Sequence, residues 1–200
     1  RSLTSSGTDT YSAISGAIGS LKGPRHGGAN IKVAEMMHYM RNEVKDWKDD
    51  DEIVNFLTRI VRKETGDRSG LIYGMGHAIY TKSDPRAVIL KENTRKLAIA
   101  KGLLDEFELT EAVERLAPSV LCGAKDDKAV RCANVDLYSG LVYRCLGIPE
   151  DLYTPLFAVA RLSGWCAHRI EEIATNGKIM RPAYKAVAET REYIPLDQRG

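Results

Sequence analysis

Apolar side chains recur every three or four positions along most of this 200-residue chain, a spacing typical of amphipathic α-helices. No long stretch alternates apolar and polar residues as a half-buried β-strand does. We therefore predict a mainly α, multi-helical fold. The expected helices cover residues 10–21, 30–44, 49–65, 84–100, 106–116, 137–146 and 149–175.

Residues that begin or end helices stand at the edges of these segments. Side-chain oxygens that can accept hydrogen bonds from the free amides of a first turn are carried by Thr8 or Asp9, by Asn30 and by Asp84. Pro118 lacks an amide hydrogen and is expected to close the helix before it, and Asn176 with the glycine after it is expected to end the last helix in a left-handed cap.

Two segments lack the helical pattern. Residues 66–83 contain several glycines around a short apolar run, which predicts a loop with one small strand pair. Residues 123–136 are polar and are also expected to form a loop. The tail after residue 177 has too few apolar residues to fold alone.

Composition narrows the class of protein. The chain has 29 Lys and Arg against 27 Asp and Glu, and these charges are mixed along the sequence, so nothing indicates nucleic-acid binding. No apolar run is long enough to span a membrane. Four cysteines without a CxxC pair fit reduced thiols, and we expect a cytoplasmic protein. Because the chain begins at Arg1 without Met and runs directly into a Ser/Thr-rich stretch, we expect a fragment.

Three residues are candidates for proton transfer. His26 and His77 each follow or precede glycines in loops, where an imidazole can exchange a proton near neutral pH; turn-filling histidines are the alternative interpretation. Asp136 stands where a polar loop meets a helix. The bare sequence favours a helix cap there, and a carboxylate general base is the alternative. Glu35 and His38 are one Glu-x-x-His pair without the second copy that a di-metal site needs, so no metal is expected.

Three arginines are oddly placed for simple solvation. Arg86 lies in a first helical turn, Arg161 interrupts an apolar helix face, and Arg181 precedes a proline. Since a guanidinium binds carboxylates through two parallel hydrogen bonds, the three suggest a ligand with more than one carboxylate. Salt bridges to acids of this chain are the alternative.

Five stretches, taken in order, resemble the citrate synthase family: GPRHGGAN, GMGHAIYTKSDPR, NVDLYSG, ARLSGWCAH and MRP. They resemble the signature segments of the C-terminal half of that family in order and separation. The resemblance implies an all-α citrate-synthase-like fold with a small mobile helical domain over 29–147 and an incomplete large domain made of 1–28 and 148–200.

The resemblance also implies a reaction, in which acetyl-CoA and oxaloacetate give citrate and free CoA through an enolate. The implied enzyme is an acyltransferase of the class that converts the acyl group into an alkyl group on transfer. Asp136 would match the base that takes a methyl proton, His26 the donor to the thioester oxygen, and His77 the group that polarises the ketone. Arg86, Arg161 and Arg181 would match the carboxylate-binding residues, with Arg181 reaching the neighbouring subunit of a homodimer.

The CoA-binding residues implied by the resemblance lie in the glycine-rich loop and just after it: Leu71, Ile72, Gly74, Met75, Gly76 and Lys82. No cofactor or metal is implied. The family's cation four residues after the ketone-binding histidine is replaced here by Thr81, and the family's N-terminal half, with another oxaloacetate-binding histidine, is missing. We therefore expect the isolated chain to turn over slowly or not at all.

Two other functions share these features. A 2-methylcitrate synthase, which uses propionyl-CoA, has the same motifs, and one methylene is worth only about 1–3 kcal/mol of discrimination. For the isolated chain, a non-catalytic module that binds CoA or forms dimers is the second alternative.

Overall fold

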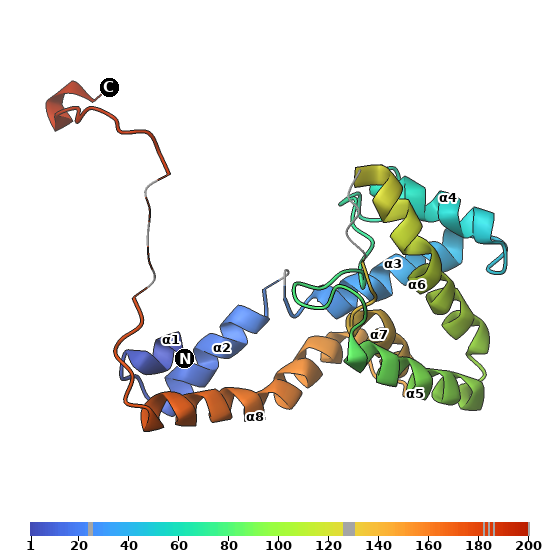
Figure 1. Ribbon diagram of the computed structural model, residues 1–200, viewed down its shortest axis with the longest axis horizontal. Coiled ribbons are helices and arrows are strands. Elements are labelled where there is room, and N and C mark those ends of the chain that lie inside the picture. Colours follow the sequence, from blue (N-terminus) through green and yellow to red (C-terminus); the bar gives the residue numbers. More distant parts are fainter. Residues whose placement is uncertain (24–25, 126–130, 182, 184, 186, 200) are drawn as a thin grey trace.

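The computed structural model describes residues 1–23, 26–125, 131–181, 183, 185 and 187–199. Within them the chain is helical and forms two groups of helices followed by an extended C-terminal segment (Figure 1). The elements are α1 (Ser2–Ser5), α2 (Thr10–Leu21), α3 (Ala29–Glu43), α4 (Asp50–Val61), α5 (Pro85–Lys101), α6 (Leu104–Lys125), α7 (Asp136–Cys145), η1 (Glu150–Leu152), α8 (Tyr153–Ala174) and η2 (Leu196–Gln198). The predicted mainly α fold is confirmed.

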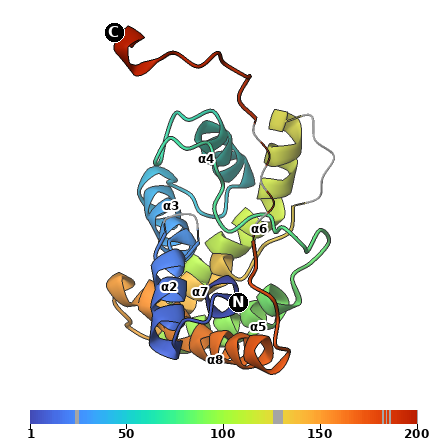
Figure 2. The ribbon, with the colours of Figure 1, turned by 90° about the vertical axis from the view of Figure 1, so that its left-hand side faces the viewer.

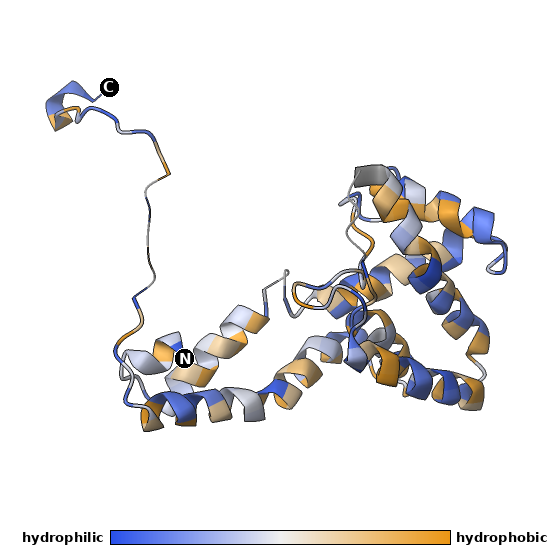
Figure 3. Ribbon diagram, viewed as in Figure 1, coloured by the Kyte–Doolittle hydropathy of each residue, from blue (hydrophilic) through white to orange (hydrophobic). Residues whose placement is uncertain are grey.

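Helices α3 to α7 share one hydrophobic core, and we call this group the α3–α7 body. Met40, Ile53, Leu57 and Phe107 are among its fully buried side chains. On α4, the apolar residues at the expected helical spacing face this core, while charged residues occupy the other side (Figure 3). The body thus provides a rigid support for the loop over residues 62–84 and for the beginning of α7.

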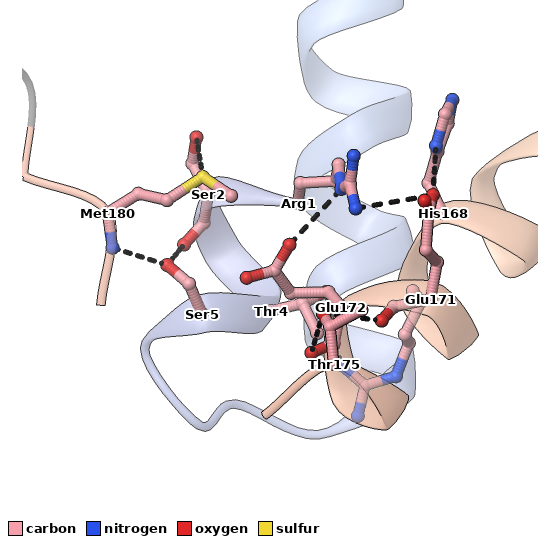
Figure 4. A network of polar contacts seen from close by, with 10 residues as sticks. Arg1, Ser2, Thr4, Ser5, His168, Glu171, Glu172, Thr175 and Met180 are labelled. Atoms are coloured by element: carbon pink, nitrogen blue, oxygen red, sulfur yellow. Dashed lines mark hydrogen bonds and ion pairs between the residues drawn. The ribbon is translucent and has the colours of Figure 1, made fainter. Parts of the chain in front are cut away.

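Helices α1, α2 and α8 form the second group, which lies beside the body (Figures 1 and 2). Arg169 of α8 donates hydrogen bonds to the Thr4 and Thr10 hydroxyls and to the Thr8 carbonyl oxygen. Arg1 pairs with Glu171 and with the buried Glu172 of α8 (Figure 4). These polar contacts hold the beginning of the chain against the end of α8.

The two groups meet where Thr154, at the start of α8, donates a 2.8 Å hydrogen bond from its hydroxyl to the carbonyl oxygen of Gly27. The amide of Gly27 in turn donates to the carbonyl oxygen of Leu21, at the end of α2, at 2.8 Å. A Cβ atom on Gly27 would lie 2.3 Å from that oxygen and 2.8 Å from Cγ2 of Thr154, so only glycine fits. Tyr153 reaches across to the carbonyl oxygen of Gly140 in α7 at 3.4 Å.

The helix starts at Asp9, Asp49 and Asp84 follow the sequence prediction. The carboxylate of Asp9 accepts from the amide of Ser12, and that of Asp84 accepts from the amide of Arg86. Asn176 adopts the predicted left-handed conformation with φ of 48° after the end of α8.

Several local predictions were wrong. Pro118 lies inside α6, which continues to Lys125, instead of ending a helix at 116. Asn30 is inside the first turn of α3, where its carboxamide donates to the Ser139 hydroxyl of α7, and Gly28 occupies the N-cap position. The helix predicted to reach residue 146 ends at Cys145, and Leu146, which follows it, is 54% exposed.

The expected strand pair within residues 66–83 does not form. Instead, Met75 makes an isolated antiparallel bridge with Ala133, from the segment that precedes α7. The predicted loop over 123–136 begins later than expected because α6 extends to Lys125, and its residues 126–130 lie outside the described part of the chain. None of the described helices has the length and apolar character needed to cross a membrane.

Candidate active site

Asp136 is the first residue of α7, and its carboxylate does not cap the helix. The amide of Asp136 instead donates a 3.0 Å hydrogen bond to Oδ1 of Asn134, so Asn134 performs the local role that the sequence favoured for Asp136. The Asp136 carboxylate accepts no hydrogen bond from any residue that the structure describes. It is therefore free to act on a ligand.

The surroundings of Asp136 disfavour its charged form. Burial raises the pKa of this carboxyl group above its ordinary value, and the negative charge of Asp84 acts in the same direction. The positive charge of Arg86 acts in the opposite direction and partly offsets the effect of burial, and His26 and His77 also lie near enough to act electrostatically on this carboxylate. The structure thus brings together four of the residues predicted for the site, from three separate segments of the chain.

His77 is fixed in orientation by its own loop. Its Nδ1 atom accepts hydrogen bonds from the amides of Ile79 at 3.0 Å and Tyr80 at 3.2 Å, and its ring lies 4.8 Å from that of Tyr80. Because Nδ1 is an acceptor, the proton of the neutral imidazole resides on Nε2. Nε2 lies 3.2 Å from Nη2 of Arg86, which also carries only donors. Two donors side by side are suited to one acceptor oxygen of a ligand.

Arg86 is held by Asp84, a completely buried residue that also caps α5. Nε and Nη2 of Arg86 donate to the two carboxylate oxygens at 3.0 and 2.7 Å. These hydrogen bonds lower the pKa of Asp84 and raise that of Arg86. The guanidinium also lies 5.6 Å from the centre of the Tyr80 ring. The prediction that Arg86 binds a ligand and the alternative of an internal salt bridge are thus compatible, because the same guanidinium contacts both Asp84 and the space beside His77.

His26 lies on the other side of the site, next to α8. Its ring meets that of Phe157 edge to face, with centres 5.8 Å apart. The guanidinium of Arg161 lies 4.9 Å from the centre of the same Phe157 ring. Phe157 therefore links His26 with Arg161, one turn further along α8, and the sequence analysis had not singled it out.

Arg181 is not brought to this group. It lies in the extended segment after α8, exposed, next to Met180, whose amide donates to the hydroxyl of Ser5 in α1 (Figure 4). In the single chain this places Arg181 beside α1 and beyond the C-terminal end of α8, whereas His26 contacts Phe157 near the start of α8.

The proposed CoA loop is joined to the segment before α7 by backbone hydrogen bonds. Gly76 donates its amide to Cys132 at 2.7 Å, and the Asn134 amide donates to the Gly74 carbonyl oxygen at 2.9 Å. Gly74 and Gly76 have φ values of 81° and 92°, which only glycine adopts readily. Of the other predicted CoA-binding residues, Ile72 is buried, Met75 is half-buried, and Leu71 and Lys82 are exposed.

Within the described residues, no group of three or more His, Cys, Asp or Glu side chains is arranged to hold a metal ion. Glu35 pairs with Lys32 at 2.6 Å, and Nε2 of His38 lies 3.0 Å from the Asn42 carboxamide.

A helical protein in which a buried carboxylate lies within electrostatic reach of two imidazoles and a fixed guanidinium is equipped for acid–base chemistry on an anionic compound. The model of the citrate synthase C-terminal domain matches residues 1–183. The chain therefore belongs to the citrate synthase family.

Individual relatives agree with this assignment. The chain is 42% identical over 196 residues to a citrate synthase of Acidithiobacillus ferridurans, an alignment that covers 96% of this chain and 46% of the relative. It is 37% identical over 193 residues to a 2-methylcitrate synthase of Shewanella oneidensis, again covering 96% of this chain and 46% of the relative. The chain thus spans about half the length of these curated relatives.

Solved structures show the same fold. The citrate synthase of Thermotoga maritima superposes with a TM-score of 0.74 at 34% identity, covering 100% of this chain and 50% of that one. A ternary complex of carboxymethyl coenzyme A and oxaloacetate with the citrate synthase of Thermoplasma acidophilum gives a TM-score of 0.73 at 32% identity, covering 99% and 49% of the two chains.

Proposed function

We propose that these 200 residues are the C-terminal part of a citrate synthase, which condenses acetyl-CoA with oxaloacetate to give citrate and CoA. The observation that carries this proposal is that Arg86, His26 and His77 all act electrostatically on the Asp136 carboxylate, which accepts no hydrogen bond within the described residues, while Nε2 of His77 lies 3.2 Å from Nη2 of Arg86. The reaction needs a base for a carbon acid, donors for two oxygens and cations for a dicarboxylate, and these residues supply those groups.

Asp136 removes a proton from the methyl carbon of acetyl-CoA. Its raised pKa makes the carboxylate a stronger base than an exposed aspartate. A thioester methyl group is a very weak acid, so the enolate oxygen has to be stabilised as the proton leaves, and this is the role of His26. The two residues therefore act in one step from opposite sides of the same carbon–oxygen unit.

His77 donates from Nε2 to the ketone oxygen of oxaloacetate, which makes the ketone carbon electrophilic toward the enolate carbon. The two backbone amides on Nδ1 keep the proton on Nε2, as this role requires. The new carbon–carbon bond gives a citryl thioester, and water then cleaves the thioester to citrate and CoA. The acyl group thereby becomes an alkyl group, as expected of this class of acyltransferase.

Arg86 and Arg161 bind carboxylates of oxaloacetate, and Arg181 serves the site of a neighbouring subunit in a homodimer. The exposed position of Arg181 on the extended segment supports a role outside its own chain. The loop over 71–76, together with Lys82, contacts CoA. The chemistry requires no further cofactor or metal, since the acid, the base and the cations are side chains. The four cysteines are free, which supports a reducing, cytoplasmic location.

A 2-methylcitrate synthase is the second candidate, because the chain is 37% identical to the enzyme of that name from Shewanella oneidensis. Both reactions use the same base and the same ketone, and they differ by one methylene of the acyl group. Comparing kcat/KM for acetyl-CoA and propionyl-CoA separates the two candidates.

The test joins this chain to the N-terminal half of the Acidithiobacillus ferridurans citrate synthase, which supplies the half of the enzyme that the chain lacks. Release of CoA thiol from acetyl-CoA and oxaloacetate is followed, with citrate measured as product. We expect the joined protein to turn over, and Asp136→Asn to lower its kcat at least about a hundredfold. The 200 residues alone should turn over slowly or not at all. If they do not, the isolated chain is best described as a non-catalytic module that binds CoA or forms dimers. A folded joined protein that forms neither citrate nor 2-methylcitrate would overturn the proposal.

A further inference from the structure

Asn134 joins the two segments that carry the base and the ketone-binding histidine. Its Oδ1 atom accepts the amide of Asp136 at 3.0 Å, and its Nδ2 atom donates to the carbonyl oxygen of Gly76 at 2.9 Å. Gly76 immediately precedes His77. One carboxamide is thus bonded to the peptide groups next to both side chains.

The same residue also fixes the backbones of these segments. The amide of Asn134 donates to the Gly74 carbonyl oxygen at 2.9 Å, and its carbonyl oxygen accepts from Leu137 at 3.2 Å. The four groups of Asn134 that can form hydrogen bonds are therefore all used, two by the loop before His77 and two by the first turn of α7.

The Asp136 carboxylate is not used to cap α7. The side chain of an N-cap residue ordinarily accepts an amide two or three residues further on, but Asp136 is already the first residue inside the helix. Oδ1 of Asn134 accepts the amide of Asp136, and within the described residues the Asp136 carboxylate accepts no hydrogen bond. Such a hydrogen bond would stabilise the charged form and lower the basicity of the carboxylate.

We propose that Asn134 is a positioning residue, whose carboxamide sets the distance between the Asp136 carboxylate and the His77 imidazole by tying together the peptide groups next to them. This inference rests on the proposed function for its catalytic consequence, while its structural part, the tie between Gly76 and Asp136, can be measured without any activity.

Three substitutions separate the two bonds of the carboxamide. In Asn134→Ser the hydroxyl can still accept the Asp136 amide but is too short to reach Gly76. In Asn134→Asp the acceptor for Asp136 remains, while a carboxylate oxygen replaces the donor to Gly76 and repels its carbonyl oxygen. Asn134→Ala removes both bonds. Asn93→Ser is the matched control, because Asn93 is exposed on α5 and donates only to the carbonyl oxygen of Ile89 in its own helix.

The first measurement is kinetic and uses the joined enzyme described above. Since displacing a reacting group by about 1 Å costs on the order of a hundredfold in rate, we expect kcat to fall about tenfold or more in Asn134→Ser and Asn134→Ala. KM for oxaloacetate should stay within about threefold, because Arg86 and Arg161, which bind its carboxylates, lie outside the loosened residues 74–80. In Asn134→Asp the added negative charge raises the pKa of Asp136, so the acidic limb of the kcat profile moves to higher pH.

The second measurement is amide hydrogen exchange in the 200-residue chain. Asn134→Ser should speed exchange of the amides of residues 74–80 while the core of the α3–α7 body keeps its protection, and Asn93→Ser should change neither. This readout remains informative if the joined wild-type enzyme is inactive, an outcome that contradicts the proposed function and not the tie itself.

Two results would overturn the inference. One is a folded Asn134→Ser or Asn134→Asp enzyme whose kcat and pH profile equal those of the wild type. The other is unchanged exchange at residues 74–80 in Asn134→Ser, which would show that the carboxamide does not hold the His77 loop. If Asn134→Ala fails to fold, the serine and aspartate variants still decide the question.

Discussion

Gly74 gives the sharpest test of how closely the His77 loop approaches α7. Its φ of 81° is unfavourable for any residue with a Cβ atom, at about 1–2 kcal/mol. A Cβ atom there would also lie 2.9 Å from Cβ and Cδ1 of Leu137 and 3.0 Å from its Cα atom. The last contact is with backbone, so a side-chain rotation cannot relieve it, and such overpacking costs about 1–3 kcal/mol. Gly74→Ala should therefore lower the free energy of unfolding by about 2–5 kcal/mol.

Gly76→Ala is the matched control. Gly76 has a similar φ of 92°, but a Cβ atom there would meet nothing within 4 Å. It should lose only the conformational part, about 1–2 kcal/mol. Both losses are obtained from urea unfolding of the 200-residue chain followed by circular dichroism, with equal slopes in the linear region. Equal destabilisation by the two substitutions would refute the close approach of Gly74 to Leu137.

The other predictions concern charge and buried hydrogen bonds. Burial raises the pKa of Asp136, so the folded state binds this proton more tightly and loses stability as pH rises from about 3.8 through the raised pKa. Asp136→Asn should therefore be more stable than the wild type at pH 7, and the difference should vanish in acid. Thermal unfolding measured over a series of pH values checks this. The Arg86 guanidinium lowers the pKa of Asp84, so the stability that this ion pair contributes is present above pH 3.8 and is lost as pH falls through the lowered pKa. In the same pH series, Asp84→Asn should lower the free energy of unfolding by about 1–3 kcal/mol at pH 7. A more stable Asp84→Asn variant at pH 7 would contradict the stabilising role of the buried pair. The hydroxyl of the fully buried Tyr138 donates to Glu114 at 2.5 Å, so Tyr138→Phe should cost about 1.5–3 kcal/mol by urea unfolding, and an unchanged midpoint would show that this bond contributes nothing.

Helix positions could be predicted where the determining interactions are local. Asp9, Asp49 and Asp84 accept amides within three residues of themselves, and these contacts depend on the sequence nearby. The prediction for Pro118 was wrong because the free-energy cost of a proline inside a helix is offset here by tertiary packing. Ala117 and Leu121 on either side of it are buried in the core, where α6 lies against α4. The periodicity around a proline does not reveal what the helix packs against.

The role of Asn30 also could not be predicted from the residues near it in the sequence. Its partner, Ser139, is 109 positions away in the sequence. An asparagine near a helix start favours a cap when only neighbouring residues are considered, and only the folded chain shows the contact with α7.

In the candidate site, too, residues marked by local sequence features could be predicted, whereas residues that matter through long-range contacts could not. His26, His77 and Asp136 could be singled out from their loop and helix-edge positions, and the family resemblance suggested their roles. Asn134 carries no such signal, since its importance lies in a contact with Gly76, 58 positions away. Phe157 appeared in the sequence as one more apolar residue of a helix, and only its ring contacts with His26 and Arg161 distinguish it.

The contact of Gly27 with Thr154 has a consequence for how the two groups of helices are connected. The chain enters the α3–α7 body near Gly27 and leaves it just before Thr154, and the 2.8 Å hydrogen bond puts these two passages side by side. A body attached through adjacent points can swivel as a unit without bending any of its helices. Asp136 and His77 belong to the body and Arg161 to α8, so a swivel of one group against the other would alter the spacing across the candidate site. Such a rotation would take place about one short connection and would leave both groups of helices intact.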